Sequence, residues 1–433
     1  MPTLRTATLG CRVNQYETEF VRQGLERAGY RDAADGEAAD LCIVNTCTVT
    51  QEGDAKSRQT VRQMAKRNPD ARIVVMGCYA TRAPEEVALL TGVSEVITDK
   101  RELPDLLQRF GVVDVPTGIA RFDNRQRAYV KVQDGCMLSC TFCIIPSVRP
   151  NLRSRSPEHI VDEVRRLVDH GHREIVLTGI HLGHYGVDQN QGRPKHDWVR
   201  LSHLLEQLVA VDGRFRIRLS SIEATEVTRE LVAVMARHSD RICPHLHVSM
   251  QSGSDGVLRR MRRRWGAKRF VDRCRLVQDS LDLPALTTDV IVGFPGETDA
   301  EFEETVRVCD DLGFSKIHIF PFSPRQGTPA ATMQDQVAPE VKQRRVEQLE
   351  RLGETLRDRY HASLRGKPLQ MLVEGRLPDR PNAVAGTSCR YTLTELSADD
   401  AGGPLPARST LIDVVAGPSL AGRIQARAVS SSL

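Results

Sequence analysis

Three cysteines in the segment DGCMLSCTFCIIP could hold a metal centre. Cys136, Cys140 and Cys143 follow the spacing Cys-x3-Cys-x2-Cys. Three thiolates on one loop can bind three irons of a [4Fe–4S] cluster and leave the fourth iron open to a cofactor or substrate, whereas four protein ligands favour electron transfer alone. A structural zinc loop is the alternative, but zinc in such sites normally takes four protein ligands, and no fourth lies nearby in the sequence. The spacing therefore favours an iron–sulfur cluster with an open iron.

Three further cysteines each follow a short apolar run in the first hundred residues. Cys11, Cys47 and Cys78 come after residues 4–9, 41–44 and 73–76, and helical patterns separate these runs. Strands that alternate with helices indicate a parallel sheet. Sheets of this kind bind ligands at the carboxyl ends of their strands. The sequence therefore predicts that these three cysteines converge on one small site.

The composition is typical of a globular protein with reduced thiols. The 433 residues carry 60 Lys plus Arg against 56 Asp plus Glu, and 40% of them are hydrophobic. The chain shows neither a signal-peptide pattern nor the run of about 18 apolar residues that a membrane span needs. We therefore expect a cytoplasmic protein without membrane contact, in which clustered cysteines serve metal binding or catalysis. The net charge of +4 is too small to indicate a nucleic-acid partner by itself.

The elements that must position these cysteines fall into three predicted domains of an α/β protein. Residues 1–122 form an N-terminal parallel-sheet domain, and residues 123–365 form an open, partial (β/α)6 barrel, two units short of a closed eightfold barrel. Residues 366–433 form a small β-barrel. The strand candidates of the partial barrel are residues 129–132, 174–178, 216–219, 245–249, 287–292 and 316–320, and those of the small barrel are residues 369–373, 391–396, 411–415 and 423–429.

The cysteine loop 136–143, placed after the first strand of a partial barrel, resembles that of the radical S-adenosylmethionine superfamily. The resemblance implies that S-adenosylmethionine chelates the open iron, and that its one-electron cleavage gives methionine and a 5′-deoxyadenosyl radical. The segments LGCRVNQYET (9–18), NTC (45–47) and GC (77–78) are similar to the N-terminal cysteine motifs of the methylthiotransferases within that superfamily. This similarity implies that Cys11, Cys47 and Cys78 ligate a second [4Fe–4S] cluster, which takes part in sulfur insertion.

Further motifs look like those of the methylthiotransferase branch that acts on threonylcarbamoyladenosine in tRNA. They are TGIHLGHYG (178–186), LSSIEATEV (219–227), HLHVSMQSGSD (245–255), DVIVGFPGET (289–298) and HIFPFSPRQGTPAATM (318–333). The implied reaction converts N6-threonylcarbamoyladenosine, next to the anticodon, to its 2-methylthio derivative. The implied partners are the anticodon stem-loop of a tRNA and a reductant such as flavodoxin or ferredoxin. The C-terminal module stands where this family carries a TRAM domain, a small RNA-binding barrel.

Two sets of residues are candidates for cofactor and RNA binding. Glycines after strand candidates permit close backbone approach to a cofactor, although each is equally consistent with a simple turn. The cofactor candidates are Gly179, Gly293, Gly296, Glu223 and Gln251. Arginines gathered past the cluster loop and in the segment 259–269, where Trp265 and Phe270 are interleaved, could bind phosphates while the aromatic rings stack on bases. These RNA candidates are Arg149, Arg153, Arg155, Arg259, Arg260, Arg262, Arg263 and Arg264; a solvated helix face is the alternative for the second group.

Two alternative functions remain. One keeps the chemistry and changes the substrate to isopentenyladenosine in tRNA or to an aspartate of a ribosomal protein. The other is a non-catalytic iron–sulfur protein that binds RNA or relays electrons. The five cysteines outside the two triads, Cys42, Cys243, Cys274, Cys309 and Cys389, show no ligand spacing and are expected in the core.

Overall fold

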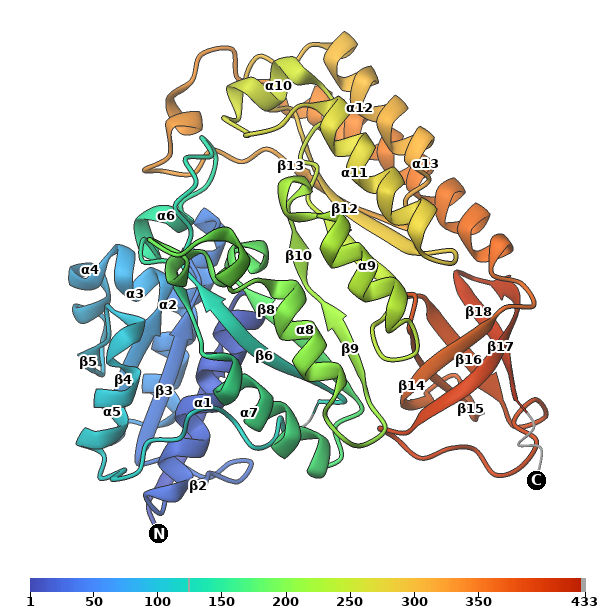
Figure 1. The fold of residues 1–433 in the computed structure, drawn as a ribbon. Helices are drawn as coiled ribbons and strands as arrows, with labels where there is room; N and C mark the ends of the chain where they lie inside the picture. Colours follow the sequence, from blue (N-terminus) through green and yellow to red (C-terminus); the bar gives the residue numbers. More distant parts are fainter. Residues whose placement is uncertain (124, 430–433) are drawn as a thin grey trace.

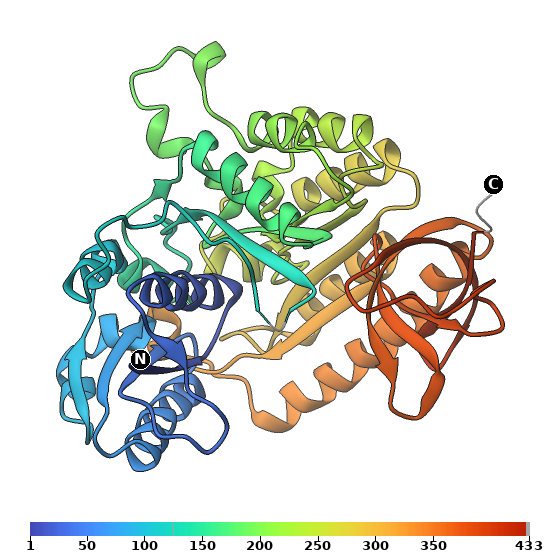
Figure 2. The same ribbon diagram turned by 90° about the horizontal axis from the view of Figure 1, so that it is seen from below.

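The computed structural model describes residues 1–123 and 125–429. Four sheets run through them, and Figure 1 shows the N-terminal sheet and the C-terminal barrel at opposite ends of a central region that holds the other two. Figure 2 shows the same arrangement from below, with helix α13 (Pro339–Ser363) running along the central region toward the barrel. The predicted α/β class and the closed C-terminal barrel are confirmed.

The N-terminal sheet is parallel, with the strand order β2-β1-β3-β4-β5. Its middle strand β3 is buried along its whole length because it pairs with a neighbour on each side and is covered by helices on its faces. The strands are β1 (Thr3–Thr8), β2 (Arg31–Asp32), β3 (Leu41–Thr46), β4 (Arg72–Gly77) and β5 (Val93–Val96). The helices are α1 (Arg12–Arg27), α2 (Gln51–Arg67), α3 (Cys78–Arg82), α4 (Pro84–Ala88) and α5 (Leu103–Arg109).

All six strands that the sequence predicted for the central region are present, but they fall into two sheets. One has the order β7-β6-β8-β9 and the other β10-β11-β12-β13, and the bridge between Ile217 and Ile242 lies where they adjoin. Two short strands, β7 and β10, were not predicted. The strands are β6 (Arg127–Asp134), β7 (Arg153–Ser154), β8 (Glu174–Gly179), β9 (Arg216–Leu219), β10 (Ser221–Ile222), β11 (His245–Val248), β12 (Ala285–Val292) and β13 (Lys316–Pro321).

The helices of the central region pack their apolar faces onto these sheets. In α7, Ile160, Val164 and Leu167 recur at helical spacing and are fully buried in the main core. A capping box between Thr298 and Glu301 begins α12. Besides α13, these helices are α6 (Ile145–Val148), α7 (Pro157–Asp169), α8 (Leu201–Val209), α9 (Arg229–Arg237), α10 (Asp255–Arg260), α11 (Ala267–Ser280) and α12 (Asp299–Leu312).

The C-terminal barrel is closed in the order β14-β15-β16-β18-β17. The sequence missed β15, because its residues RPNAVAGTS include Pro, Asn and Gly, which strands generally avoid. Pairing with β14 and β16 on its two sides nevertheless holds this segment extended. The strands are β14 (Pro368–Leu377), β15 (Arg380–Ser388), β16 (Leu393–Ser397), β17 (Leu411–Leu420) and β18 (Arg423–Ala428).

Candidate active site with two cysteine triads

The first cysteine triad lies on the loop between β6 and α6. Gln133, fully buried at the end of β6, shapes this loop: its Nε2 donates to the carbonyls of Asp134 and Gly135, and its Oε1 accepts from the backbone N–H of His181 after β8. The carbonyl of Cys140 in turn accepts from the backbone N–H of Cys143 at 3.1 Å. The position of Gln133, directly before the DGC segment that opens the cysteine loop, was the sequence signal for this residue, and our sequence analysis missed it.

The three thiols of this loop form a donor set that fits an iron–sulfur cluster. Cys136, Cys140 and Cys143 lie close enough for their charges to interact. Burial raises the pKa of the Cys143 thiol to about 12. A thiol of this kind stays protonated in the empty site at neutral pH, and metal binding supplies the charge that holds it as a thiolate.

A cavity of about 270 Å³ lies against Cys140 and the residues before it in the loop, 137–139. Glu223, one of the predicted cofactor residues, lines it and pairs with Arg263 at 2.8 Å. The same arginine places its Nη1 3.4 Å from the Cys140 sulfur, so it links the predicted cofactor residue to a predicted cluster ligand. Arg262, Arg264 and His184 also line the cavity, and its three arginines suit a ligand with anionic groups.

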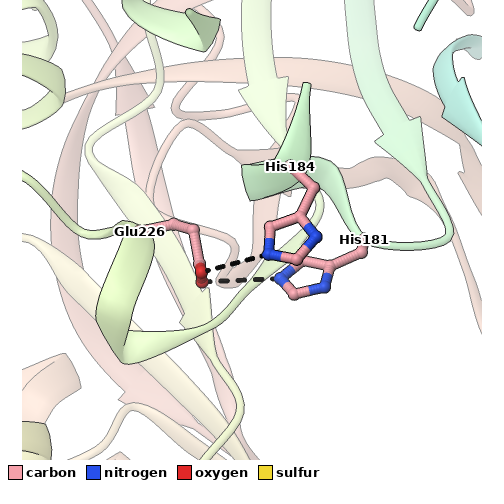
Figure 3. Close-up of side chains that lie close together, drawn as sticks. All are labelled: His181, His184 and Glu226. Atoms are coloured by element: carbon pink, nitrogen blue, oxygen red, sulfur yellow. Dashed lines mark ion pairs between the residues drawn. The ribbon is translucent and has the colours of Figure 1, made fainter. Parts of the chain in front are cut away.

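Two histidines and a glutamate form a buried cluster beside this cavity, shown in Figure 3. The rings of His181 and His184 stack with their centroids 3.6 Å apart, and each ring places Nε2 about the same distance, 3.5 and 3.6 Å, from the Glu226 carboxylate. Burial alone would raise the pKa of Glu226, but its interactions with the nearby His181 and His184 rings hold that pKa well below the ordinary value. His181 also lies 3.9 Å from the Cys136 sulfur through Nδ1.

The sequence analysis quoted the motifs that carry these three residues but did not single the residues out. Arg264 Nη2 lies 3.1 Å from both Glu226 and His184, so an arginine already occupies the open edge of the cluster. His181, His184, Glu226 and Arg264 therefore hold one another in place beside the cavity, next to the first cysteine loop.

The second triad forms where three neighbouring parallel strands end. Thr8 of β1 pairs with Asn45 of β3, and Thr46 pairs with Gly77 of β4, so the strands finish level with one another. The predicted convergence of Cys11, Cys47 and Cys78 at one edge of the sheet follows directly from this register. The loops approach so closely that a Cβ built on Gly10, which has a φ of 91°, would lie 2.9 Å from the Cys47 sulfur.

Buried amides hold the loops of the second triad in place. Asn14 Nδ2 donates to the carbonyls of Leu9 and Thr46, which joins the ends of β1 and β3. Asn45 Nδ2 donates back to the carbonyl of Asn14 at 2.9 Å. Hydrogen bonds thus hold the loops of the three cysteines together, and Cys11 and Cys47 each lie close enough to Cys78 for their charges to interact. This donor set also fits a cluster held by three cysteines.

The prediction that Arg149 contacts RNA is wrong. Its side chain is only 1% exposed, because it reaches back from the central region into the N-terminal sheet. It forms a two-pronged ion pair with Glu17, bonds Asp134 at 2.8 Å and donates from Nε to the Cys78 sulfur at 3.3 Å. A buried guanidinium with all these partners is not available to a phosphate.

Two protein-family models match this chain, one in the N-terminal region and one in the central region. The Radical SAM superfamily model matches residues 130–309, and the model of the Uncharacterized protein family UPF0004 matches residues 3–98. The threonylcarbamoyladenosine tRNA methylthiotransferase MtaB of Bacillus subtilis (strain 168) is 42% identical over 392 residues, which cover 86% of this chain and 85% of that protein. The tRNA-2-methylthio-N(6)-dimethylallyladenosine synthase of Corynebacterium diphtheriae is 36% identical over 403 residues, 88% of this chain and 78% of that protein.

The chain belongs to the radical S-adenosylmethionine methylthiotransferases. Membership implies S-adenosylmethionine and a [4Fe–4S] cluster as cofactors. Among solved structures, the radical S-adenosylmethionine methyltransferase TsrM from Kitasatospora setae has a TM-score of 0.56 at 13% identity, covering 76% of this chain and 75% of that one. This likeness concerns the fold alone.

The other predicted cofactor residues of this methylthiotransferase lie apart from the lining of the cavity beside Cys140. Gly179 ends β8, where a Cβ would meet Gln133 at 2.9 Å, and Gly293 donates its N–H to Glu297 in the turn after β12. Gly296, with a φ of 71°, accepts a hydrogen bond from Arg260. Gln251 takes a φ of 69° where its backbone bridges to Val290. Their direct contact with a cofactor stays a prediction.

Most of the predicted RNA arginines of this methylthiotransferase have partners within the protein. Arg155 bonds Glu163, Arg260 bonds Glu301, and Arg263 is only 4% exposed. Trp265 and Phe270 are buried and stack on each other, so the prediction that they stack on bases is wrong: the apolar rings pack into the core instead. Arginines that remain exposed or half-exposed, and so keep their prediction as RNA contacts, are Arg153, Arg259, Arg262 and Arg264.

The five remaining cysteines are buried, as predicted. In the described ranges 1–123 and 125–429, no helix is both long and apolar enough to cross a membrane.

Proposed function

We propose that this chain converts N6-threonylcarbamoyladenosine, next to the anticodon of tRNA, to its 2-methylthio derivative in the cytoplasm. The observation that carries the proposal is the pair of cysteine triads, one at the strand ends of the N-terminal sheet and one on the loop after β6, linked through Arg149. Two sites for three thiolates each suit a reaction that needs both a radical source and a source of sulfur. The relative from Bacillus subtilis carries the name of this activity.

In this proposal the residues of each triad hold one cluster. Cys136, Cys140 and Cys143 would bind a [4Fe–4S] cluster with S-adenosylmethionine on its open iron, and Cys11, Cys47 and Cys78 would bind a second cluster. When bound, these groups supply the radical chemistry, the sulfur and the methyl group. A low-potential reductant such as flavodoxin or ferredoxin would supply electrons.

The chain's own residues orient the reactants and exclude water. The Arg263–Glu223 pair fixes one wall of the cavity beside Cys140, and the Glu226 cluster fixes the next. The cationic lining of Arg262, Arg263 and Arg264 favours a substrate with a carboxylate, such as the threonylcarbamoyl group, over an apolar isopentenyl group. Cys78 and Cys140, one cysteine of each triad, are buried, which limits the access of water to these two ligands.

The exposed arginines would bind the tRNA backbone near this cavity. Arg153, Arg259, Arg262 and Arg264 would contact phosphates of the anticodon stem-loop. The closed C-terminal barrel is a further candidate surface for the same RNA.

The test is an anaerobic assay. The protein is reconstituted with iron and sulfide, reduced, and given S-adenosylmethionine with tRNA that bears threonylcarbamoyladenosine. Nucleosides from the digested RNA are analysed by mass spectrometry, and 5′-deoxyadenosine is measured in parallel. The methylthio nucleoside is the expected product. Deoxyadenosine without the methylthio nucleoside would point to isopentenyladenosine or to a ribosomal-protein aspartate as the substrate. A sample with both clusters that makes neither deoxyadenosine nor the methylthio nucleoside would indicate a non-catalytic iron–sulfur protein.

A further inference from the structure

Arg149 contacts a cysteine of each triad, one through its backbone and one through its side chain. The backbone N–H of Cys136 donates to the Arg149 carbonyl at 3.0 Å, and Arg149 Nε donates to the Cys78 sulfur at 3.3 Å. Only the four-residue helix α6 and Ile144 separate Arg149 from Cys143 in the chain. One residue therefore joins the two candidate cluster sites through short, directional contacts.

The side chain of Arg149 is fixed in this position by buried carboxylates. Glu17 receives both Nη atoms at 2.7 and 2.8 Å, Asp134 receives Nη1 at 2.8 Å, and Asn14 receives Nη2 at 3.0 Å. Lys131 bonds the same two carboxylates at 2.7 and 2.6 Å. Two cations thus balance two anions, and the guanidinium has little freedom to turn away from the sulfur.

A permanent positive charge held against a cluster ligand has a defined electrostatic effect. Arginine stays charged at any pH at which the protein is folded. Hydrogen bonds and positive charge at a ligand sulfur stabilise the reduced, more negative state of a cluster and so raise its reduction potential. The same contact also fixes the Cys78 loop relative to the loop of the first triad.

We propose that Arg149 is a positioning residue for both cluster sites, which raises the reduction potential of the cluster held by Cys78 and sets its distance from the cluster held by Cys136. The proposal rests on the two triads being cluster sites. Iron content of the unsubstituted, reconstituted chain tests that premise separately, because about eight irons per chain are expected for two clusters.

The first measurement isolates the second cluster. Full-length protein with Cys136, Cys140 and Cys143 changed to Ala is reconstituted anaerobically, and its midpoint potential is measured by redox titration with electron paramagnetic resonance. Arg149→Gln in this background is expected to shift the midpoint to a more negative potential, and Arg149→Lys, which keeps the charge but not the planar fork, is expected to restore part of the shift.

Arg325 provides the matched control. It is only 4% exposed and reaches from the central region to Thr48 and Asp54 of the N-terminal region at 2.6 and 2.7 Å, so it bonds a hydroxyl and a carboxylate rather than a sulfur. Arg325→Gln removes a buried inter-region arginine without touching a predicted ligand. Because Arg325 bonds no ligand sulfur and acts on Cys47 only through Asp54, Arg325→Gln is expected to shift the midpoint potential of the second cluster by much less than Arg149→Gln does.

The second measurement concerns the distance between the clusters. In the chain with both triads intact, the magnetic coupling between the two reduced clusters is expected to change in Arg149→Gln and to stay the same in Arg325→Gln. An Arg149 variant whose cluster-free form melts at the parental temperature, and which keeps both the parental potential and the parental coupling, would overturn the proposal. If the cluster-free Arg149→Gln protein melts below the parental temperature, the midpoint potential and the magnetic coupling of Arg149→Lys decide whether the proposal holds. Loss of iron from the second site alone, at an unchanged melting temperature, would support the proposal.

Discussion

Changing Glu174 to Gln tests how the C-terminal barrel is attached to the rest of the protein. Glu174 is fully buried at the start of β8 and accepts hydrogen bonds at 2.7 Å from Nε of both Arg216 and Arg218. The two arginines also donate to barrel carbonyls: Arg216 to those of Gln370 and Thr387, and Arg218 to those of Ser388 and Cys389. The carboxylate therefore orients both guanidinium groups for docking of the barrel.

The substitution keeps the shape of the side chain and removes its charge. Two buried guanidinium groups then lose their counter-ion, and breaking a buried pair in this way costs about 3–5 kcal/mol. At about 2–4 °C for each kcal/mol in a domain of 150–250 residues, we expect the melting temperature to fall by about 6–20 °C. Calorimetry measures this fall, and limited proteolysis near Gly366 is expected to release the barrel faster.

The pH dependence of the difference in melting temperature between the parent and Glu174→Gln gives a second check. The paired arginines oppose burial and hold the pKa of Glu174 well below its ordinary value of about 4.3. The stabilisation is therefore complete above about pH 4.3 and is lost as the pH falls below that value, because the unfolded state then binds more protons than the folded state. The melting difference between the parent and Glu174→Gln is expected to shrink in that range.

Glu206 is the control for this experiment, because it pairs with Arg237 and His238 at the surface. Exposed pairs of this kind contribute about 1 kcal/mol or less, so Glu206→Gln should melt within a few degrees of the parent. A Glu174→Gln protein that melts as close to the parent as the control, with the same proteolysis rate, would refute the reasoning about the docked barrel.

Three further outcomes are expected at the candidate active site. Cys140→Ala and Cys47→Ala should each lose about half of the bound iron. Cys140→Ala should abolish S-adenosylmethionine cleavage, whereas Cys47→Ala should keep cleavage and lose the methylthio product. Full product from Cys47→Ala would disprove the two-cluster assignment. Glu226→Gln should retain its iron, as measured colorimetrically, but lower product formation by about 10-fold, because Arg264 and the paired histidines lose the carboxylate that holds them; an unchanged rate would exclude this role. Cluster assembly, followed by its visible absorbance, should become faster as the pH rises, since burial raises the pKa of Cys143 to about 12 and iron binds the thiolate; a rate that does not depend on pH would contradict this.

Local patterns in the sequence were sufficient for most of the strands and for the grouping of the cysteines into two triads. All six predicted strands of the central region are present, and the cysteines at the ends of β1, β3 and β4 meet as the parallel-sheet rule requires. Such predictions succeed because strand period and cysteine spacing are properties of a few neighbouring residues. β15 was missed for the same reason, since its own residues disfavour a strand and only its neighbours in the barrel make it one.

The roles of the charged residues were decided by the tertiary structure. Arg149, Arg153 and Arg155 look alike in the sequence, yet the first lies buried between Glu17 and Cys78, the second is exposed, and the third bonds Glu163. Asp134 is the near partner of Arg149, but Glu17, Asn14 and Cys78 lie more than 70 positions away in the sequence, so no local pattern could identify them. The sequence by itself determined which chemistry is possible, because that depends on residue type and spacing. Which cation binds RNA and which holds a cluster site depends on burial and on opposite charges that meet only when the chain is folded.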